Sequence, residues 1–181
     1  MRVASNARHS KATPRWGSPG DLVARGRKAM GGLDLDPASE EKFNKVVQAP
    51  KYYSWEERQE DGLVLPWAGK VWLNPPGGLV KEFWRRIFTQ EDVEQVLWVG
   101  FSMEQLGILA SETYHPSDFS ILYCRKRISF SRHDDYEGAP SHSNYCVGIN
   151  VDHEAFVEAF GDLGKIQRGP HAQSNVRPAT S

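Results

Sequence analysis

The sequence predicts an α/β fold in which helices cover both faces of a largely parallel β-sheet. Two observations lead to this class. Apolar runs such as 94–101 (EQVLWVGF) have the composition of strands that are buried on both faces. Segments such as 79–88 (LVKEFWRRIF), in which apolar residues recur at helical spacing, alternate with these runs along the chain. With 181 residues, 39% of them hydrophobic, the chain is long enough to bury one substantial core.

The first part of the chain predicts a helix, a strand and a second helix. Residues 18–32 (SPGDLVARGRKAMGG) form a helix with Ser18 as its N-cap, Pro19 at its first position and two glycines at its end. The run 33–36 (LDLD) is a short strand that the following proline cuts off. The serine at position 39 is expected to cap the next helix. Beyond it, the chain up to residue 69 is rich in loops, aromatic residues and acidic residues.

The second part continues the alternation of strands and helices. Apolar runs bounded by turn residues predict the strands, and apolar residues at helical spacing predict the helices. We expect strands at 70–73, 94–101, 119–124, 127–130 and 144–149, and helices at 79–88, 103–112 and 152–164.

One domain, residues 14–167, accounts for all of these elements. Residues 1–13 and 168–181 are polar and show no periodicity, so we expect them to be disordered tails. The chain has no internal repeat and no long linker between the tails.

Composition and single-residue patterns exclude several classes of function. The net charge of −1 means that any contact with nucleic acid must come from local basic patches. The chain lacks an apolar run of membrane-spanning length and a signal peptide, so we expect a cytoplasmic protein that does not bind membranes. Cys124 and Cys146 are isolated and are expected to be free, buried thiols. The six histidines match no metal-binding spacing, so no metal is expected.

The stretch 71–78 (VWLNPPGG) places a rigid corner, Asn74-Pro75-Pro76, directly after a predicted strand. Proline has no N–H, so the Asn74 side-chain oxygen and the Pro75 carbonyl are available as acceptors. An exocyclic amino group has two hydrogens and can satisfy both acceptors, which orients its nitrogen for attack on an electrophilic methyl group. The alternative is a tight turn that only ends the strand, because a lone Asn-Pro-Pro tripeptide is a weak signal.

A second polar residue, Asp36, also follows a predicted strand. In sheets of this class, ligands bind at the carboxyl ends of the strands. We therefore expect Asp36 and Asn74 to belong to one site. The alternative is that Asp36 only caps the helix that follows it and has no role in a site.

Six segments resemble, in the same order, the motifs of the phage-type DNA N-6-adenine methyltransferases, a Dam-like family. The resemblance covers residues 15–167, and the ordered series is more specific than any single motif. The similar segments are Trp16-Gly17-Ser18-Pro19 (W-x-[TS]-P), Leu33–Ala38 (LDPA) with Asn44 downstream, Tyr52-Tyr53 with Asp61-Gly62-Leu63 and Trp67, Trp72–Pro76, Arg127-Ile128-x-Phe130, and Phe156–Gly164.

The resemblance implies a Rossmann-like S-adenosylmethionine-dependent methyltransferase of phage or prophage origin, acting in the host cytoplasm on adenine N6 in DNA. The target base would leave the duplex to reach the site. Asn74 and Pro75, with Pro76, would hold the target amino group. Asp36 would bind the amino-acid end of the cofactor, and Asp61 would lie near its adenine. The implied cofactor-binding residues are Trp16, Ser18, Pro19, Asp36, Pro37 and Asp61.

Position 77 departs from the family pattern. The family has an aromatic residue after Asn-Pro-Pro, which stacks on the extruded base, whereas this chain has Gly77. Base stacking contributes roughly 1–3 kcal/mol. Two alternatives follow: a methyltransferase acting on another planar amino group (cytosine N4, an RNA base or a protein glutamine), or a DNA-binding relic with weak or no activity.

A basic cluster surrounds the predicted strand at 127–130. Arg125, Lys126, Arg127 and Arg132 are candidates for DNA phosphate contacts. An edge strand protected by charge explains the same pattern equally well.

Overall fold

A computed structural model describes residues 16–132, 137–138 and 143–169 of the chain. The expected N-terminal tail, 1–13, and residues 170–181 of the expected C-terminal tail, 168–181, lie outside the described residues. Arg168, which we expected in the C-terminal tail, is the last residue of a strand.

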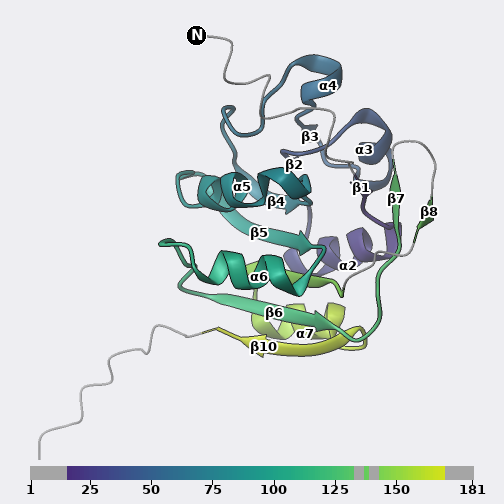
Figure 1. Ribbon diagram of the computed structural model, residues 1–181, viewed down its shortest axis with the longest axis vertical. Helices are drawn as coiled ribbons and strands as arrows, with labels where there is room; N and C mark the ends of the chain where they lie inside the picture. The colour runs from purple at the N-terminus through teal and green to yellow at the C-terminus, as the bar shows by residue number, and fades with distance from the viewer. Residues whose placement is uncertain (1–15, 133–136, 139–142, 170–181) are drawn as a thin grey trace, which may run out of the picture.

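The main sheet has seven strands in the order β10-β6-β9-β5-β4-β2-β3 (Figure 1). One half is parallel and the other antiparallel. The parallel half consists of β3 (Lys51–Tyr52), β2 (Leu35–Asp36), β4 (Gly69–Leu73) and β5 (Val93–Gly100); the antiparallel half adds β9 (Tyr145–Ile149), β6 (Phe119–Cys124) and β10 (Gly164–Arg168).

The α/β class is therefore confirmed, but the sheet is mixed. The expected parallel arrangement holds for only four of the seven strands. The difference lies in β9, which runs antiparallel to both of its neighbours. Its apolar sequence is that of a buried strand and carries no information on direction, because parallel and antiparallel strands buried on both faces look alike.

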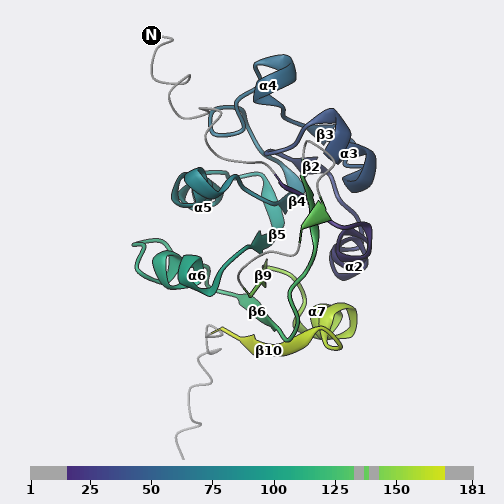
Figure 2. The same ribbon diagram turned by 45° about the vertical axis from the view of Figure 1, so that its right-hand side comes forward.

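Helices cover both faces of the sheet, as expected (Figures 1 and 2). Alternation along β4 points Trp72 into the core under α2 and Leu73 into the core under α5. One face carries α2 (Gly20–Met30), α3 (Glu41–Val47) and α7 (His153–Phe160); the other carries α5 (Val80–Ile87) and α6 (Met103–Ala110).

Both N-caps predicted for the first two helices were wrong. α2 has Pro19 as its N-cap, because the Ser18 hydroxyl is hydrogen-bonded to the side chains of Trp72 and Asn74. α3 has Glu40 as its N-cap, whose side chain makes no capping hydrogen bond; the Glu57 carboxylate closes this end instead, because it accepts from the Glu41 N–H at 2.8 Å.

Several short elements lie where the sequence predicted loops or a helix end. The segment 48–69 contains β3 and a one-turn helix, α4 (Trp55–Arg58). The helix predicted over 152–164 is shorter, because α7 ends at Phe160 and the chain turns into β10. A 3-10 turn, η1 (Gly77–Leu79), separates the corner from α5.

A second, three-stranded sheet has the order β1-β7-β8 and lies at one end of the main sheet (Figures 1 and 2). It pairs β1 (Trp16–Gly17) with β7 (Phe130–Arg132), so the start of the described chain meets the segment that leaves β6. The third strand is β8 (Glu137–Gly138). The strand predicted at 127–130 therefore begins three residues later than expected.

Candidate active site

The chain reverses its direction of travel across the sheet between β2 and β4. From β2 it passes through α3 to β3 on one side, and then returns to β4 on the other side. Ligands of open α/β sheets bind at such a switch point, outside the carboxyl ends of the strands. Asp36 ends β2 and Asn74 directly follows β4. Leu35 is paired with Val71, so the Cα atoms of Asp36 and Asn74 are about 8 Å apart from strand geometry.

The amide group of Asn74 is held in one orientation. Its Nδ2 donates to the Trp16 carbonyl at 2.6 Å and to the Ser18 Oγ at 3.1 Å. A carbonyl can only accept, so the nitrogen and not the oxygen of the amide must face Trp16. The Asn74 Oδ1 is buried and has no hydrogen-bond partner among the described residues.

The backbone of the corner presents a second unpaired acceptor. The Pro76 carbonyl accepts from the Leu79 N–H at 2.9 Å, at the start of the 3-10 turn. Pro75 is a buried residue, and within the described part of the chain its carbonyl accepts no hydrogen bond. A buried polar atom without a hydrogen bond, such as Asn74 Oδ1, costs about 1–3 kcal/mol and calls for a functional explanation. Together, these two acceptors on adjacent residues can receive the two hydrogens of one amino group.

Two aspartates support the loops around the corner. Asp36 is buried, and its Oδ1 accepts from the Ala38 N–H at 3.2 Å. Asp61 is also buried, and its Oδ1 accepts from the Leu63 N–H at 2.9 Å. The two turns touch at Gly62, where a Cβ atom would lie 1.9 Å from the Pro37 carbonyl oxygen. The structure thus brings together the LDPA and DGL segments, as their assignment to one site requires.

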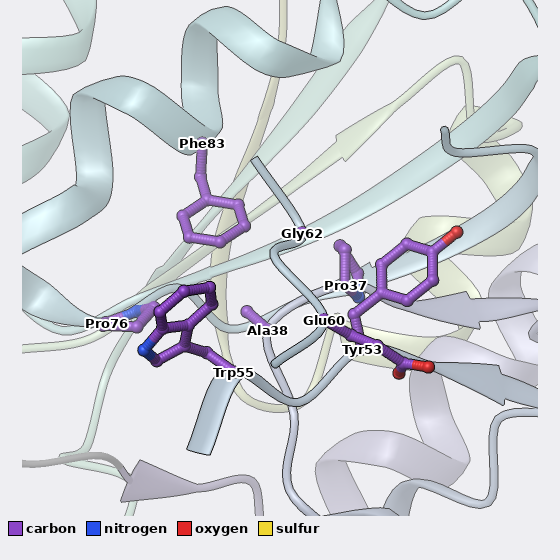
Figure 3. Close-up of a pocket in the computed structure, with 8 residues that line it drawn as sticks. All are labelled: Pro37, Ala38, Tyr53, Trp55, Glu60, Gly62, Pro76 and Phe83. Carbon is purple, nitrogen blue, oxygen red and sulfur yellow. The ribbon is translucent and has the colours of Figure 1, made fainter. Parts of the chain in front are cut away.

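A small pocket, with room for about one water molecule, opens between these turns and the corner (Figure 3). Figure 3 shows the rings of Trp55 and Phe83 next to each other near Pro76, with Tyr53 on the side of Pro37. The complete lining is Pro37, Ala38, Tyr53, Trp55, Glu60, Gly62, Pro76 and Phe83.

Four of these lining residues carried no predicted role in a site. Phe83 is a core residue, as its helical spacing predicts, and its ring also lines the pocket. Tyr53 belongs to a segment that resembles the family, whereas Trp55 stands out in the sequence only as an aromatic residue in a polar loop. Glu60 has a buried Oε2 without a hydrogen bond, 3.8 Å from the Nη1 of Arg58.

The remaining expected cofactor residues lie on the α2 side of the corner. Trp16 belongs to β1 and contacts Asn74 through its carbonyl. Ser18 is buried, and its hydroxyl also accepts from the Trp72 Nε1 at 3.2 Å. Pro19 starts α2, and its carbonyl accepts from the Val23 N–H. Trp16 and Ser18 contact Asn74, whereas Pro37 and Gly62 line the pocket on the α5 side.

The basic segment lies at the same edge of the sheet as the corner. β5 and β6 are both antiparallel to β9, so their carboxyl ends, and that of β4, share one edge. Arg125, Lys126 and Arg127 follow β6 and are exposed. From there the chain reaches β7, whose Arg132 is paired with Trp16. The Arg132 side chain lies outside the described part of the structure.

Two cations in the last turn of α5 make contacts within the protein. Arg85 forms a 2.6 Å ion pair with Glu112, and this hydrogen bond holds the pKa of the Glu112 carboxyl below its usual value. Arg86 donates to the carbonyls of Val64 and Leu65 at 3.0 Å. Arg85 therefore holds α5 to the segment after α6, and Arg86 holds it to the loop before β4.

The two cysteines are free, as predicted, although Cys124 is only half-buried. A hydrogen bond between the thiols lowers the pKa of Cys124 and, together with burial, raises that of Cys146. They lie on β6 and β9, so neither can act as a nucleophile at the Asn74 corner.

Among the described residues, no helix has both the length and the apolar character that crossing a bilayer requires. The same residues contain no group of three or more His, Cys, Asp or Glu side chains arranged to hold a metal ion. No protein-family model matches the chain, and a search of curated proteins finds no match.

Proposed function

We propose that this protein is an S-adenosylmethionine-dependent DNA methyltransferase that acts on the N6 amino group of adenine. The observation that carries the proposal is the pair of unpaired acceptors, Asn74 Oδ1 and Pro75 O, at the carboxyl edge of the sheet. The two hydrogens of one amino group would satisfy both. The order β3-β2-β4-β5, with its switch point at β2 and β4, supports a Rossmann-like site at this edge.

The corner would act by orienting its substrate. Accepting both hydrogens of N6 makes the nitrogen more electron-rich and fixes the direction of its lone pair. The cofactor, when bound, supplies an electrophilic methyl group on a sulfonium. The nitrogen–methyl bond forms as the sulfur–methyl bond breaks, and the surplus proton on N6 passes to water. No side-chain nucleophile and no covalent enzyme intermediate are required.

The residues around the pocket fit the chemistry of the cofactor. The aromatic rings of Trp55 and Phe83 offer apolar surfaces for its adenine ring, next to the turn that contains Asp61. The Glu60 Oε2 is a buried acceptor without a hydrogen bond, suited to a ribose hydroxyl, as acidic residues are in other nucleotide-binding sheets. Asp36, on the strand next to the corner, would bind the amino-acid end of the cofactor.

The exposed segment 125–127 would contact the phosphates of the DNA from the same edge. Replacing Arg125, Lys126 and Arg127 together by alanine should lower the slope of log K against log salt by about 2 to 3, because each phosphate contact contributes about 0.9. Fluorescence anisotropy of a labelled duplex over a salt series measures this slope. Lys45→Ala, in the last turn of α3, is the control and should leave the slope unchanged. An unchanged slope in the triple variant would show that the segment makes no phosphate contact; protection of a strand edge does not apply, because β7 lies between β1 and β8.

The test of the function is methyl transfer from radiolabelled cofactor to unmethylated DNA, followed by nucleoside analysis. Label on N6-methyladenine supports the proposal. The corner fits any planar amino group, so RNA and a glutamine-containing protein are assayed in parallel. Label on cytosine N4, RNA or protein, with none on adenine, would overturn the proposed substrate. Cofactor binding without methyl transfer to any of these substrates would contradict the proposal that the protein is an active methyltransferase.

A substitution at Gly77 distinguishes two hypotheses, an active enzyme and a relic that only binds DNA. The residue is exposed in the 3-10 turn and its φ angle is not positive, so a tyrosine side chain is compatible with the backbone. If the missing ring limits activity, Gly77→Tyr should tighten DNA binding and raise kcat/KM about tenfold, since stacking contributes roughly 1–3 kcal/mol. A fall in kcat/KM, measured with the same transfer assay, would instead show that the site is built around the glycine.

A further inference from the structure

We propose that Ser18 is a positioning residue, which holds the Asn74 amide in the orientation that the Trp16 carbonyl selects, with its oxygen facing the substrate. This inference rests on the proposed function and deepens it. An oxygen at that position selects a base with an amino group, whereas a nitrogen would select a base with a carbonyl group. The family resemblance implies a cofactor contact for Ser18; its hydroxyl oxygen accepts from Asn74 and Trp72, so only the hydroxyl hydrogen remains to be donated.

The hydrogen bonds around Asn74 make the two orientations of the amide unequal. In the observed one, Nδ2 uses both of its hydrogens, on the Trp16 carbonyl and on Ser18 Oγ. Rotation of the amide by half a turn would place Oδ1 2.6 Å from the Trp16 carbonyl oxygen, so that two acceptors would face each other. The nitrogen would then lie where the amino group of the substrate is expected.

Ser18 is suited to this role because its hydroxyl oxygen is already occupied. A hydroxyl oxygen has two acceptor lone pairs, and these receive the Trp72 Nε1–H and the Asn74 Nδ2–H. No lone pair remains for a donor on the cofactor. Both lone pairs of the Ser18 oxygen are therefore used by Asn74 in the corner and by Trp72 in the core.

The position of Ser18 is itself fixed from two sides. It is 4% exposed and lies between β1 and the first turn of α2. Its second donor, Trp72, is 0% exposed in the middle of the sheet, two residues before Asn74. Trp72, which donates to Ser18, thus lies in β4, and Asn74 directly follows the same strand.

The experiment compares Ser18→Ala, Trp72→Phe and the double variant. Ser18→Ala alone leaves the buried Trp72 Nε1–H without an acceptor, which can disturb the fold. The double variant removes both partners, so any remaining defect belongs to Asn74. Three quantities are measured: kcat at saturating cofactor, the cofactor Kd by calorimetry with S-adenosylmethionine, and the exchange rate of the Asn74 side-chain amide protons by NMR.

We expect kcat to fall about tenfold in Ser18→Ala and in the double variant, the effect of losing one hydrogen bond. The cofactor Kd should change less than twofold, and Trp72→Phe alone should lower kcat less than either variant that lacks the serine. A tenfold weaker cofactor Kd with unchanged kcat would overturn the inference in favour of a cofactor contact. Unchanged kcat in both variants that lack the serine would also overturn it.

The NMR measurement separates this inference from the proposed function. The Asn74 amide protons should exchange faster without Ser18, in free protein and without any methyl transfer. If the amide protons exchange faster in a protein that methylates no DNA, the role of Ser18 in positioning Asn74 is supported and only the proposed function is contradicted. Unchanged exchange would overturn the role of Ser18, whatever the substrate.

Discussion

Replacing Asn74 by alanine should lower kcat/KM for methyl transfer to DNA by at least about a hundredfold, comparable to the loss of one preorganised group in other active sites. The variant removes the buried Oδ1 and leaves only the Pro75 carbonyl for the two hydrogens of the amino group. The cofactor Kd should change little, because the proposed cofactor contacts lie on other residues. Transfer kinetics with radiolabelled cofactor and calorimetry check the two parts of this prediction.

Asn44→Ala is the matched control for this variant. Both ends of the Asn44 amide are bonded to the backbone of Ala49, where they close the C-terminus of α3. Its loss should lower the melting temperature and leave kcat/KM within about twofold of the wild-type value. Full activity in Asn74→Ala would show that the corner is only a turn at the end of β4.

Replacing Gly62 by alanine should cost about 3 kcal/mol of folding stability, at the upper end for an added methyl group in packed surroundings. The new Cβ would lie 1.9 Å from the Pro37 carbonyl oxygen, which belongs to the backbone and cannot rotate away. The Gly62 carbonyl also accepts from the Trp67 Nε1 at 2.7 Å, so the loop is held on its other side. Urea unfolding gives the stability change, and calorimetry should show weaker cofactor binding, because the turn after Asp61 forms part of the pocket.

Gly107→Ala is the opposite control. Gly107 lies in α6, and a Cβ atom there would meet nothing within 4 Å. Alanine should therefore stabilise the protein by roughly 0.5–1 kcal/mol through helix propensity alone. If Gly62→Ala unfolds at the same urea concentration as the wild type, the close contact between the two turns does not contribute to folding stability, and the prediction is contradicted.

Much of the fold could be predicted because the apolar pattern fixes burial. The run ending at Leu73, the run 94–101 and the helix 79–88 bury the predicted faces, and their bounds differ from the structure by a few residues. Strand direction and short pairings could not be predicted. The two-residue strands β1 and β3 exist only because a partner strand lies beside them, which no local pattern records.

Part of the candidate site could likewise be predicted from the sequence, and part could not. The corner and Asp36 could be located because each follows a strand, and parallel strands bring such ends to one edge. The role of Ser18 could not be read, since a serine before a proline is an equally good N-cap pattern. The pocket wall was hidden for a similar reason: Phe83 has the spacing of a core residue, and it also stacks on Trp67 with a centroid distance of 6.1 Å.

The antiparallel course of β9 also bears on how such a protein can change its target. The chain leaves the sheet after Cys124 and re-enters at Asn144, and the Cys124 N–H donates to the Asn144 carbonyl at 3.2 Å. The chain therefore leaves the sheet and returns to it at the same edge, and this hydrogen bond joins the two ends of the intervening segment. An exchange of the intervening residues that kept the backbone pairing of β7 with β1 would leave the strand order and the Asn74 corner in place. Under the proposed function, DNA sequence preference and catalytic chemistry could then diverge independently during evolution, even in a single small domain.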